Sequence, residues 1–290
     1  MLNIFEDRLI ALPSSYRLDG RESTHPLDVR GYSAIQCYVL KESESALLIG
    51  TGLPGHQQRI LESLREVLGS SAVSLLPLRL DFTAIANARA IADCFGVERV
   101  HQRYPYPPAG WLNVRPEFSL DDNQALEAAT VSPALSGEAI AVDREGSRRL
   151  CLLSSPLRLL PAHWAYDETT STLFSVDMFS WVGRPTSDGP WVITDDDDDP
   201  TTSDAIAHHL TGTRYWWLPN ADTEGIRRGL AEIFDQRTIE TIAPDFGCIL
   251  HGPAVVGRHY QLLDDFLATA PRLPSIGVSV GTWPLSHRTP

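Results

Sequence analysis

Short apolar runs arrive in pairs along this chain, and each cluster of pairs is followed by segments with helical periodicity. The run 34–40 is separated from the run 46–50 by a charged turn, which is typical of a β-hairpin. Residues 56–68 then carry apolar side chains at helical spacing, a further strand is expected at 72–80, and an alanine-rich helix is expected at 82–95. The first half of the chain is therefore expected to form a sheet that helices cover.

The second half repeats this arrangement. Two strands are expected within 136–155, and a further hairpin is expected to join 157–167 to 173–177. Helices are expected at 203–211, 222–235 and 259–268. Two clusters of paired strands, each followed by helices, predict an α/β (α+β) fold: a four-layer αβ/βα sandwich of two mixed sheets flanked by helices, in one domain spanning 1–290.

Three segments depart from this pattern. Residues 104–116 contain four prolines and are not expected to form regular structure. The tail 272–290 is expected to be extended. The five consecutive aspartates Asp195–Asp199 are interpreted as a solvated loop or as a cap before the helix at 203–211. A Ca²⁺ site is the alternative, although the run lacks the glycine and the alternating ligands of an EF-hand.

The charge balance argues against two classes of partner. Lys and Arg number 24 and Asp and Glu number 37, which gives a formal net charge of −13. A nucleic-acid-binding protein needs a basic surface that displaces counterions from phosphates. Docking on an anionic membrane needs the same sign of charge. We therefore expect neither nucleic acid nor membrane as a partner.

Targeting signals and paired cysteines are not evident in the sequence. The first twenty residues lack the basic start and the apolar core of a signal peptide, and no apolar run approaches the ~18 residues of a membrane-spanning helix. The cysteines are widely spaced and form no C-x-x-C pair: Cys37, Cys94, Cys151 and Cys248. A cytoplasmic protein with free thiols is expected.

Four segments carry a resemblance to a known family: 30–52, which ends in Gly50-Thr51-Gly52, then 78–87, 160–179 and 242–248. In this order and spacing they resemble the metallo-β-lactamase fold, and more narrowly the branch of flavodiiron proteins and oxygen-binding di-iron proteins. The resemblance covers about residues 28–255. It implies a site in which a carboxylate bridges two metal ions, surrounded by further nitrogen and oxygen ligands.

Residue by residue, the resemblance implies that the metal loop of this family is altered here. Arg79 stands where the family has its first ligand His, and Asp81 stands where it has a second His or a Glu. Thr83 replaces an Asp, and Ala84 replaces the following His. Gly50 takes the position of the Asp in the family's Asp-Thr-Gly turn.

Two other ligand positions of the family are retained, and one is lost. His163 matches a metal-binding His, Asp177 matches the bridging Asp, and Phe246 replaces the final ligand His. The resemblance therefore implies a degenerate metal site, in which Asp81, His163 and Asp177 are the candidate ligands for a single metal ion.

Charge balance leads to a specific expectation for this degenerate site. Without metal ions, Asp81 and Asp177 would repel each other or one would take up a proton. A guanidinium carries a permanent positive charge and can bridge carboxylates. We therefore expect a salt bridge from Arg79 to Asp81 or Asp177, close to His163 and Phe246. His163 itself is open to two interpretations, as a metal ligand or as a core His bonded to Asp177 or to a backbone carbonyl.

Three functions are compatible with these residues. The first is a metal-poor or metal-free binding or interaction protein that needs no cofactor. The second is a hydrolase that holds one iron or zinc ion on Asp81, His163 and Asp177 and activates a water. The third is a di-iron oxidoreductase or oxygen-binding protein, which would need a separate redox partner because no flavodoxin domain follows in this sequence. The resemblance also implies a possible homodimer.

Overall fold

The computed structural model describes residues 1–102, 128–158 and 161–274. Its centre is formed by two seven-stranded sheets that pack against each other. In spatial order the first sheet contains β1 (Leu2–Phe5), β2 (Leu9–Ala11), β5 (Tyr38–Lys41), β6 (Ser45–Ile49), β7 (Ala72–Leu76), β8 (Arg99–Gln102) and β9 (Thr130–Pro133). The first four strands are antiparallel, and β6 through β9 are parallel, so this sheet is mixed.

The second sheet is also mixed. In spatial order it contains β10 (Ala139–Ala141), β11 (Arg149–Ser154), β12 (His163–Asp167), β13 (Thr172–Val176), β15 (Thr241–Pro244), β16 (Ile249–His251) and β14 (Val192–Ile193). The pairs β13 with β15 and β14 with β16 are parallel, and the remaining pairs are antiparallel. A separate ribbon pairs β3 (Ser14–Leu18) with β4 (Gly31–Ile35).

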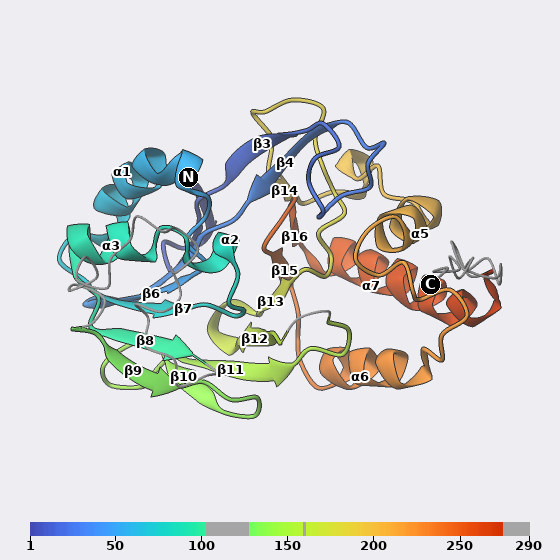
Figure 1. The fold of residues 1–290 in the computed structure, drawn as a ribbon. Helices are drawn as coiled ribbons and strands as arrows, with labels where there is room; N and C mark the ends of the chain where they lie inside the picture. The colour runs from blue at the N-terminus through green and yellow to red at the C-terminus, as the bar shows by residue number, and fades with distance from the viewer. Residues whose placement is uncertain (103–127, 159–160, 275–290) are drawn as a thin grey trace, which may run out of the picture.

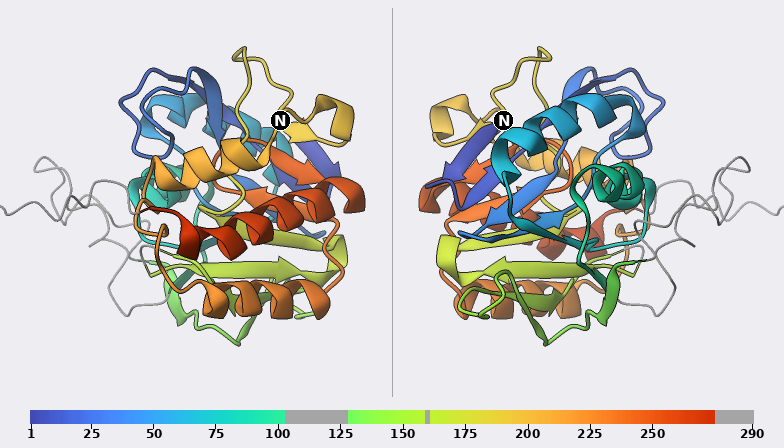
Figure 2. Two further views of the ribbon diagram at one scale, coloured as in Figure 1. Left: turned by 90° about the vertical axis from the view of Figure 1, so that its right-hand side faces the viewer. Right: turned by 90° about the vertical axis from the view of Figure 1, so that its left-hand side faces the viewer.

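Helices cover the outer faces of the two sheets (Figures 1 and 2). The first sheet is covered by α1 (Gln57–Leu68) and α3 (Ala88–Phe95), with the short α2 (Phe82–Ile85) beside them. The second sheet is covered by α5 (Ser203–Thr211), α6 (Glu224–Asp235) and α7 (Pro253–Thr269). Single 3₁₀ turns are η1 (Pro54–His56), η4 (Glu168–Thr170), η5 (Asp196–Asp198) and η6 (Ala270–Arg272). The prediction of two mixed sheets flanked by helices is confirmed.

Strand β6 shows why the layers form. Leu47 and Ile49 are buried in the core between the sheets, together with Trp164 of the second sheet. Leu48 points to the opposite face and packs in a second core with Ile60 of α1. Successive side chains of a strand point to opposite faces, so a continuous apolar run is buried on both sides.

Two predicted elements are divided in the structure. The run 34–40 is not one strand, because Gln36 is bonded through its N–H to Asp245 O at 2.9 Å and through its side chain to Gly247 O at 2.8 Å. This separates β4 from β5. The helix expected at 82–95 is interrupted at Asn87, whose side-chain amide donates to Thr51 O at 2.8 Å and so fixes the chain outside the helix.

Other predicted boundaries also differ from the structure. Strand β7 ends before Pro77, which has no N–H to donate to a neighbouring strand. Helix α7 begins at Pro253 rather than at 259, and the strands β1, β2, β3, β9 and β14 were not predicted. The expectations for 104–116 and for the tail beyond residue 274 concern residues outside the described ranges.

The sequence suggested that the aspartate run 195–199 is a solvated loop or a cap. In the structure the run is not uniformly exposed. Asp195 caps η5 by accepting the N–H of Asp197 at 3.0 Å, and both are exposed. The side chain of Asp199 is fully buried, where it pairs with Arg258 and accepts from His259 Nε2 at 2.8 Å. Arg258 compensates the buried charge and His259 adds a hydrogen bond, so the run serves as a structural connection to α7.

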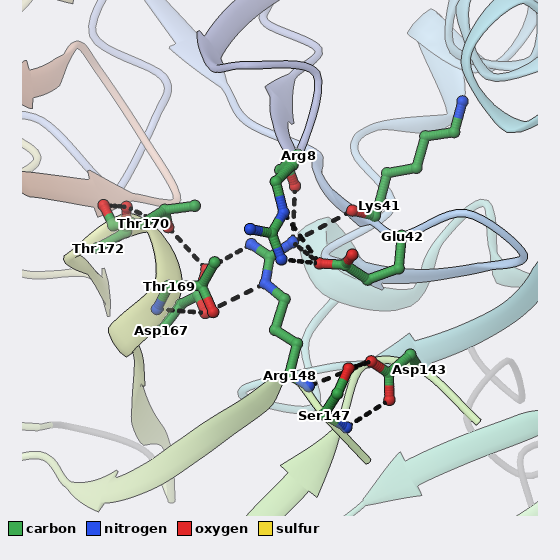
Figure 3. A network of polar contacts seen from close by, with 10 residues as sticks. All are labelled: Arg8, Lys41, Glu42, Asp143, Ser147, Arg148, Asp167, Thr169, Thr170 and Thr172. Carbon is green, nitrogen blue, oxygen red and sulfur yellow. Dashed lines mark hydrogen bonds and ion pairs between the residues drawn. The ribbon is translucent and has the colours of Figure 1, made fainter. Parts of the chain in front are cut away.

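A buried ion-pair network joins the two sheets at one end (Figure 3). The side chains of Arg148 and Asp167 are 1% and 0% exposed, and Arg148 Nε lies 3.2 Å from Asp167 Oδ1. Arg148 Nη1 also donates to Arg8 O at 3.1 Å, to Lys41 O at 3.2 Å and to Glu42 Oε1 at 3.0 Å. One guanidinium thereby connects the end of β12 to the β5–β6 turn of the other sheet.

Candidate functional site

The candidate site lies at the carboxyl ends of β7, β13 and β15. Arg79 follows β7 and forms an isolated antiparallel bridge with Ala162, which precedes β12. The neighbouring Leu78 O accepts the N–H of His163 at 2.9 Å. This crossing of the two chains directs Arg79 into the protein, where the residue is 2% exposed.

Three carboxylates surround the guanidinium of Arg79. Its Nε lies 2.8 Å from Asp81 Oδ2 and 3.5 Å from Asp245 Oδ2, and its Nη1 pairs with Asp177 Oδ1. Its Nη2 donates to Thr83 Oγ1 at 3.2 Å. The expected ion pair is therefore present, and Arg79 contacts both Asp81 and Asp177.

Asp81 is held in place by the start of α2. It is the N-cap residue of this helix, and its Oδ1 accepts the N–H groups of Thr83 at 3.1 Å and Ala84 at 3.2 Å. Thr83 Oγ1 also donates to Asp81 Oδ1 at 2.7 Å. One carboxylate oxygen thus caps the helix, and the other is left for Arg79. Ala84 contributes only its backbone.

Asp177 and Asp245 come from neighbouring parallel strands. β13 and β15 pair side by side, and the N–H of Asp245 donates to Val176 O at 2.8 Å just beyond them. Asp177 also pairs with Arg214, whose Nη1 lies 3.0 Å from Asp177 Oδ1. The cluster therefore contains three carboxyl groups and two guanidinium groups.

Two aromatic side chains adjoin the cluster. The Cζ atom of Arg79 lies 5.2 Å from the ring centroid of Phe246, a distance suited to a cation–π contact. Phe246 therefore packs against the guanidinium as expected. Tyr215 is buried, and within the described residues its hydroxyl has no hydrogen-bond partner. Burial and the nearby Asp177 raise the pKa of Tyr215, so its hydroxyl stays protonated.

Asp245 and Arg79 differ in how firmly they keep their charge within the cluster. Burial raises the pKa of Asp245 to about 7, an effect that Arg79 partly offsets and that Asp81 and Asp177 increase. Burial alone would lower the pKa of Arg79, but Asp245, Asp177 and Asp81 raise it overall. Arg79 is therefore a permanent cation, while Asp245 changes its charge near neutral pH.

His163 is placed differently from the other predicted site residues. Its ring Nδ1 lies 2.8 Å from Ser136 Oγ, and the residue is 3% exposed. No group of three or more His, Cys, Asp or Glu side chains within the described ranges is arranged to hold a metal ion. Asp81 and Asp177 are instead arranged around a guanidinium, an arrangement that does not fit a metal pair.

Three members of the cluster were not predicted as site residues. Asp245 lies inside the segment 242–248 and directly follows a buried strand, and this position was the available signal. Arg214 and Tyr215 lie in the turn between α5 and α6, where no sequence motif marks them. Only the tertiary structure brings this turn to Asp177.

Comparison with known proteins identifies the fold. A scan against family models gives no match, and a search of curated proteins finds no similar sequence. Rubredoxin oxygen:oxidoreductase from Desulfovibrio gigas is similar at a TM-score of 0.67 and 13% identity, over 92% of this chain and 61% of that chain. The flavodiiron protein from Giardia intestinalis is similar at a TM-score of 0.59 and 14% identity, over 89% and 57%. A diflavin flavoprotein fragment from Nostoc is similar at a TM-score of 0.60 and 13% identity, over 91% and 93%.

The chain therefore has the fold of these flavodiiron protein structures. This confirms the fold that the four sequence segments had suggested. The chain spans about three fifths of the first two structures. At these identities the similarity concerns the fold, and the chemistry of this chain depends on its own residues.

Proposed function

We propose that this chain is a metal-independent member of its fold that acts as a binding or interaction protein, with Arg79 in the place of a metal ion. One observation carries the proposal: the buried guanidinium of Arg79 contacts the carboxyl groups of Asp81, Asp177 and Asp245. Asp81 and Asp177 stand at positions that hold metal ligands in the family that the sequence resembles. In this chain they are ligands of a side-chain cation.

The chemistry of the guanidinium supports this proposal. It is planar and always charged, and it donates hydrogen bonds to several acceptors at once. Arg79 has Nε in an ion pair with Asp81, pairs through Nη1 with Asp177 and donates from Nη2 to Thr83 Oγ1. It has no lone pair and no open coordination position, so it neutralises the carboxylates without activating a substrate. A degenerate site of this kind would stabilise the fold and leave function to the protein surface.

The experiment must distinguish a metal-independent protein from the alternative, a single-metal hydrolase. A metal ion on Asp81, His163 and Asp177 would have to displace Arg79 from two of these residues, because both carboxylates pair with it. We therefore propose that neither iron nor zinc, and no separate redox partner, is required.

Elemental analysis of the full chain purified without chelators tests this proposal. We expect iron and zinc far below one ion per chain, and a melting temperature that does not change when either ion or EDTA is added. Stoichiometric iron or zinc that is lost in Asp177→Asn and kept in Asp188→Asn would reject it. Asp188 is an exposed aspartate outside the cluster and serves as the matched control.

The proposal extends to location and partners. We propose a cytoplasmic protein that forms a homodimer and binds neither nucleic acid nor membranes. The net charge of −13 supports the last part. No helix within the described residues has the length and apolarity needed to cross a bilayer. Light scattering and cell fractionation test the oligomeric state and the location.

A further inference from the structure

Two adjacent tryptophans form an exposed apolar surface in the turn between α5 and α6. Trp216 is 54% exposed and Trp217 is 38% exposed, while their neighbours Tyr215 and Leu218 are buried. Large aromatic side chains bury much area when they find a partner, so two exposed tryptophans that follow each other in the chain mark a candidate interaction site. We refer to Trp216 and Trp217 as the tryptophan surface.

The described chain ends close to this surface. After α7, Ala270 O accepts the N–H of Asn220 at 2.9 Å. One turn earlier, Leu267 O accepts from Thr223 Oγ1 at 2.6 Å. Asn220 follows the tryptophan surface by only a few residues, and the last described residue follows Ala270 at a similar distance. Because a residue spans at most ~3.6 Å, residues 275–290 begin within reach of the surface and are long enough to cross it.

The sequence of residues 275–290 suits an apolar docking surface. Ile276, Val278 and Val280 alternate with glycine and serine, and Trp283 and Leu285 follow. The segment contains no Asp or Glu, although the whole chain carries a net charge of −13. An extended segment with this alternation presents its apolar side chains on one face. Its composition is therefore complementary to exposed indoles on an acidic protein.

We propose that residues 275–290 bind to the tryptophan surface of the same chain. The occupant follows from the position at which the described chain ends, from the alternating apolar pattern and from the absence of acidic residues in the segment. The inference concerns a surface outside the Arg79 cluster and does not depend on the proposed function. In this arrangement the C-terminal segment is an intramolecular ligand, which a protein with a similar extended apolar segment could displace.

Oxidative footprinting tests the proposal on the full chain and on a chain that ends at Pro274. We expect oxidation of Trp216 and Trp217 to increase severalfold on truncation, while Phe82, which is 58% exposed elsewhere, is unchanged. A synthetic peptide of residues 275–290 should restore protection to the truncated chain. The same peptide with Val278→Ser, Val280→Ser and Trp283→Ser should not.

A second variant leaves the C-terminal segment intact. In the full chain, Trp216→Ser with Trp217→Ser should increase hydrogen exchange in residues 275–290, and Phe82→Ser should not. Equal oxidation of both tryptophans in the full and truncated chains would overturn the proposal. Protection that depends on protein concentration would overturn it as well, because a second copy would then be the occupant.

Discussion

Arg79 and Asp177 connect the two sheets through a buried ion pair, since Arg79 follows β7 of the first sheet and Asp177 follows β13 of the second. Arg148, which pairs with Asp167 within the second sheet, connects the sheets through its bonds to Lys41 O and Glu42 near the turn that leads into β6. Because β6 and β7 are parallel, these connections lie at opposite ends of the first sheet. The cluster around Arg79 thus has a counterpart at the other end of the first sheet, where the buried guanidinium of Arg148 also joins the two sheets.

Replacing Arg79 by alanine should destabilise the protein by about 3 kcal/mol, because the change strands partly buried carboxylates without their cation. Denaturant unfolding at pH 7 measures this loss. Arg144→Ala is the matched control, since Arg144 pairs with Glu98 at 2.6 Å on the surface with 63% of its side chain exposed. Surface pairs contribute about 1 kcal/mol or less. Similar losses in the two variants would contradict the interpretation of Arg79 as a buried substitute cation.

The network at the other end of the sheet should show strong coupling between its partners. Arg148→Met or Asp167→Leu alone leaves one buried charge unpaired and should cost about 3–5 kcal/mol. The double variant removes both charges and should recover a large part of that loss. A double-mutant cycle measured by denaturant unfolding gives the coupling energy. Additive losses would show that the two side chains act independently.

Asp245 should make stability depend on pH in an identifiable direction. In the folded protein its pKa is about 7, against an ordinary value of 3.8. Between these values the folded state retains a proton that the unfolded state has lost, so the free energy of unfolding falls as pH rises, by up to about 1.4 kcal/mol per pH unit. Asp245→Asn removes this contribution. Its stability relative to the wild type should therefore increase from pH 4 to pH 7 and level off above.

Two buried histidines should have the opposite effect at acid pH. The rings of His25 and His209 are 5.3 Å apart. Burial lowers the pKa of His25 to about 4, and it also lowers the pKa of His209 well below the ordinary value of 6.5. As pH falls from 6.5 to 4, the unfolded chain takes up protons that the folded chain excludes, so stability falls. His25→Gln should reduce this acid-induced loss and leave the slope above pH 7 unchanged. An unchanged slope between pH 4 and 6.5 would refute the assignment.

Local sequence patterns were sufficient to predict the layers of the fold. They were not sufficient to predict where a strand and a helix are interrupted. The continuous apolar run of β6 and the helical spacing of α1 follow from which faces are buried, and these patterns are visible in the sequence. The interruptions at Gln36 and Asn87 depend on hydrogen bonds to Gly247 and Thr51, which are remote in sequence. Local periodicity contains no information on such partners, so the divided elements were predicted as continuous.

The candidate site likewise contains residues that the sequence predicted and residues that it did not. Arg79 and Asp177 were predicted because charge balance and motif order both apply to them, and Phe246 was predicted from motif order alone. Asp245 was missed although it is adjacent to Phe246, since a single acid after a strand is a weak signal. Arg214 reaches Asp177 from the turn after α5, and only the packing of that helix on the second sheet determines this contact.

Restoring imidazoles to the cluster should create a metal site. In the variant Arg79→His, Thr83→Asp and Phe246→His, the substitute cation is gone and three ligand positions of the resemblance are filled again. Asp81, Asp177, Asp245 and the carboxylate added by Thr83→Asp then face one another with only Arg214 as a cation, so the variant should be less stable than the wild type in the absence of metal. Zinc or ferrous iron at ~100 times its Kd should raise the stability by about 2.7 kcal/mol, and the wild type should show no such gain. Adding Asp177→Asn to the variant is the control and should abolish the gain. If the wild type were stabilised by the same ions to the same extent, Arg79 would not be occupying the place of a metal, and the single-metal hydrolase would become the better interpretation.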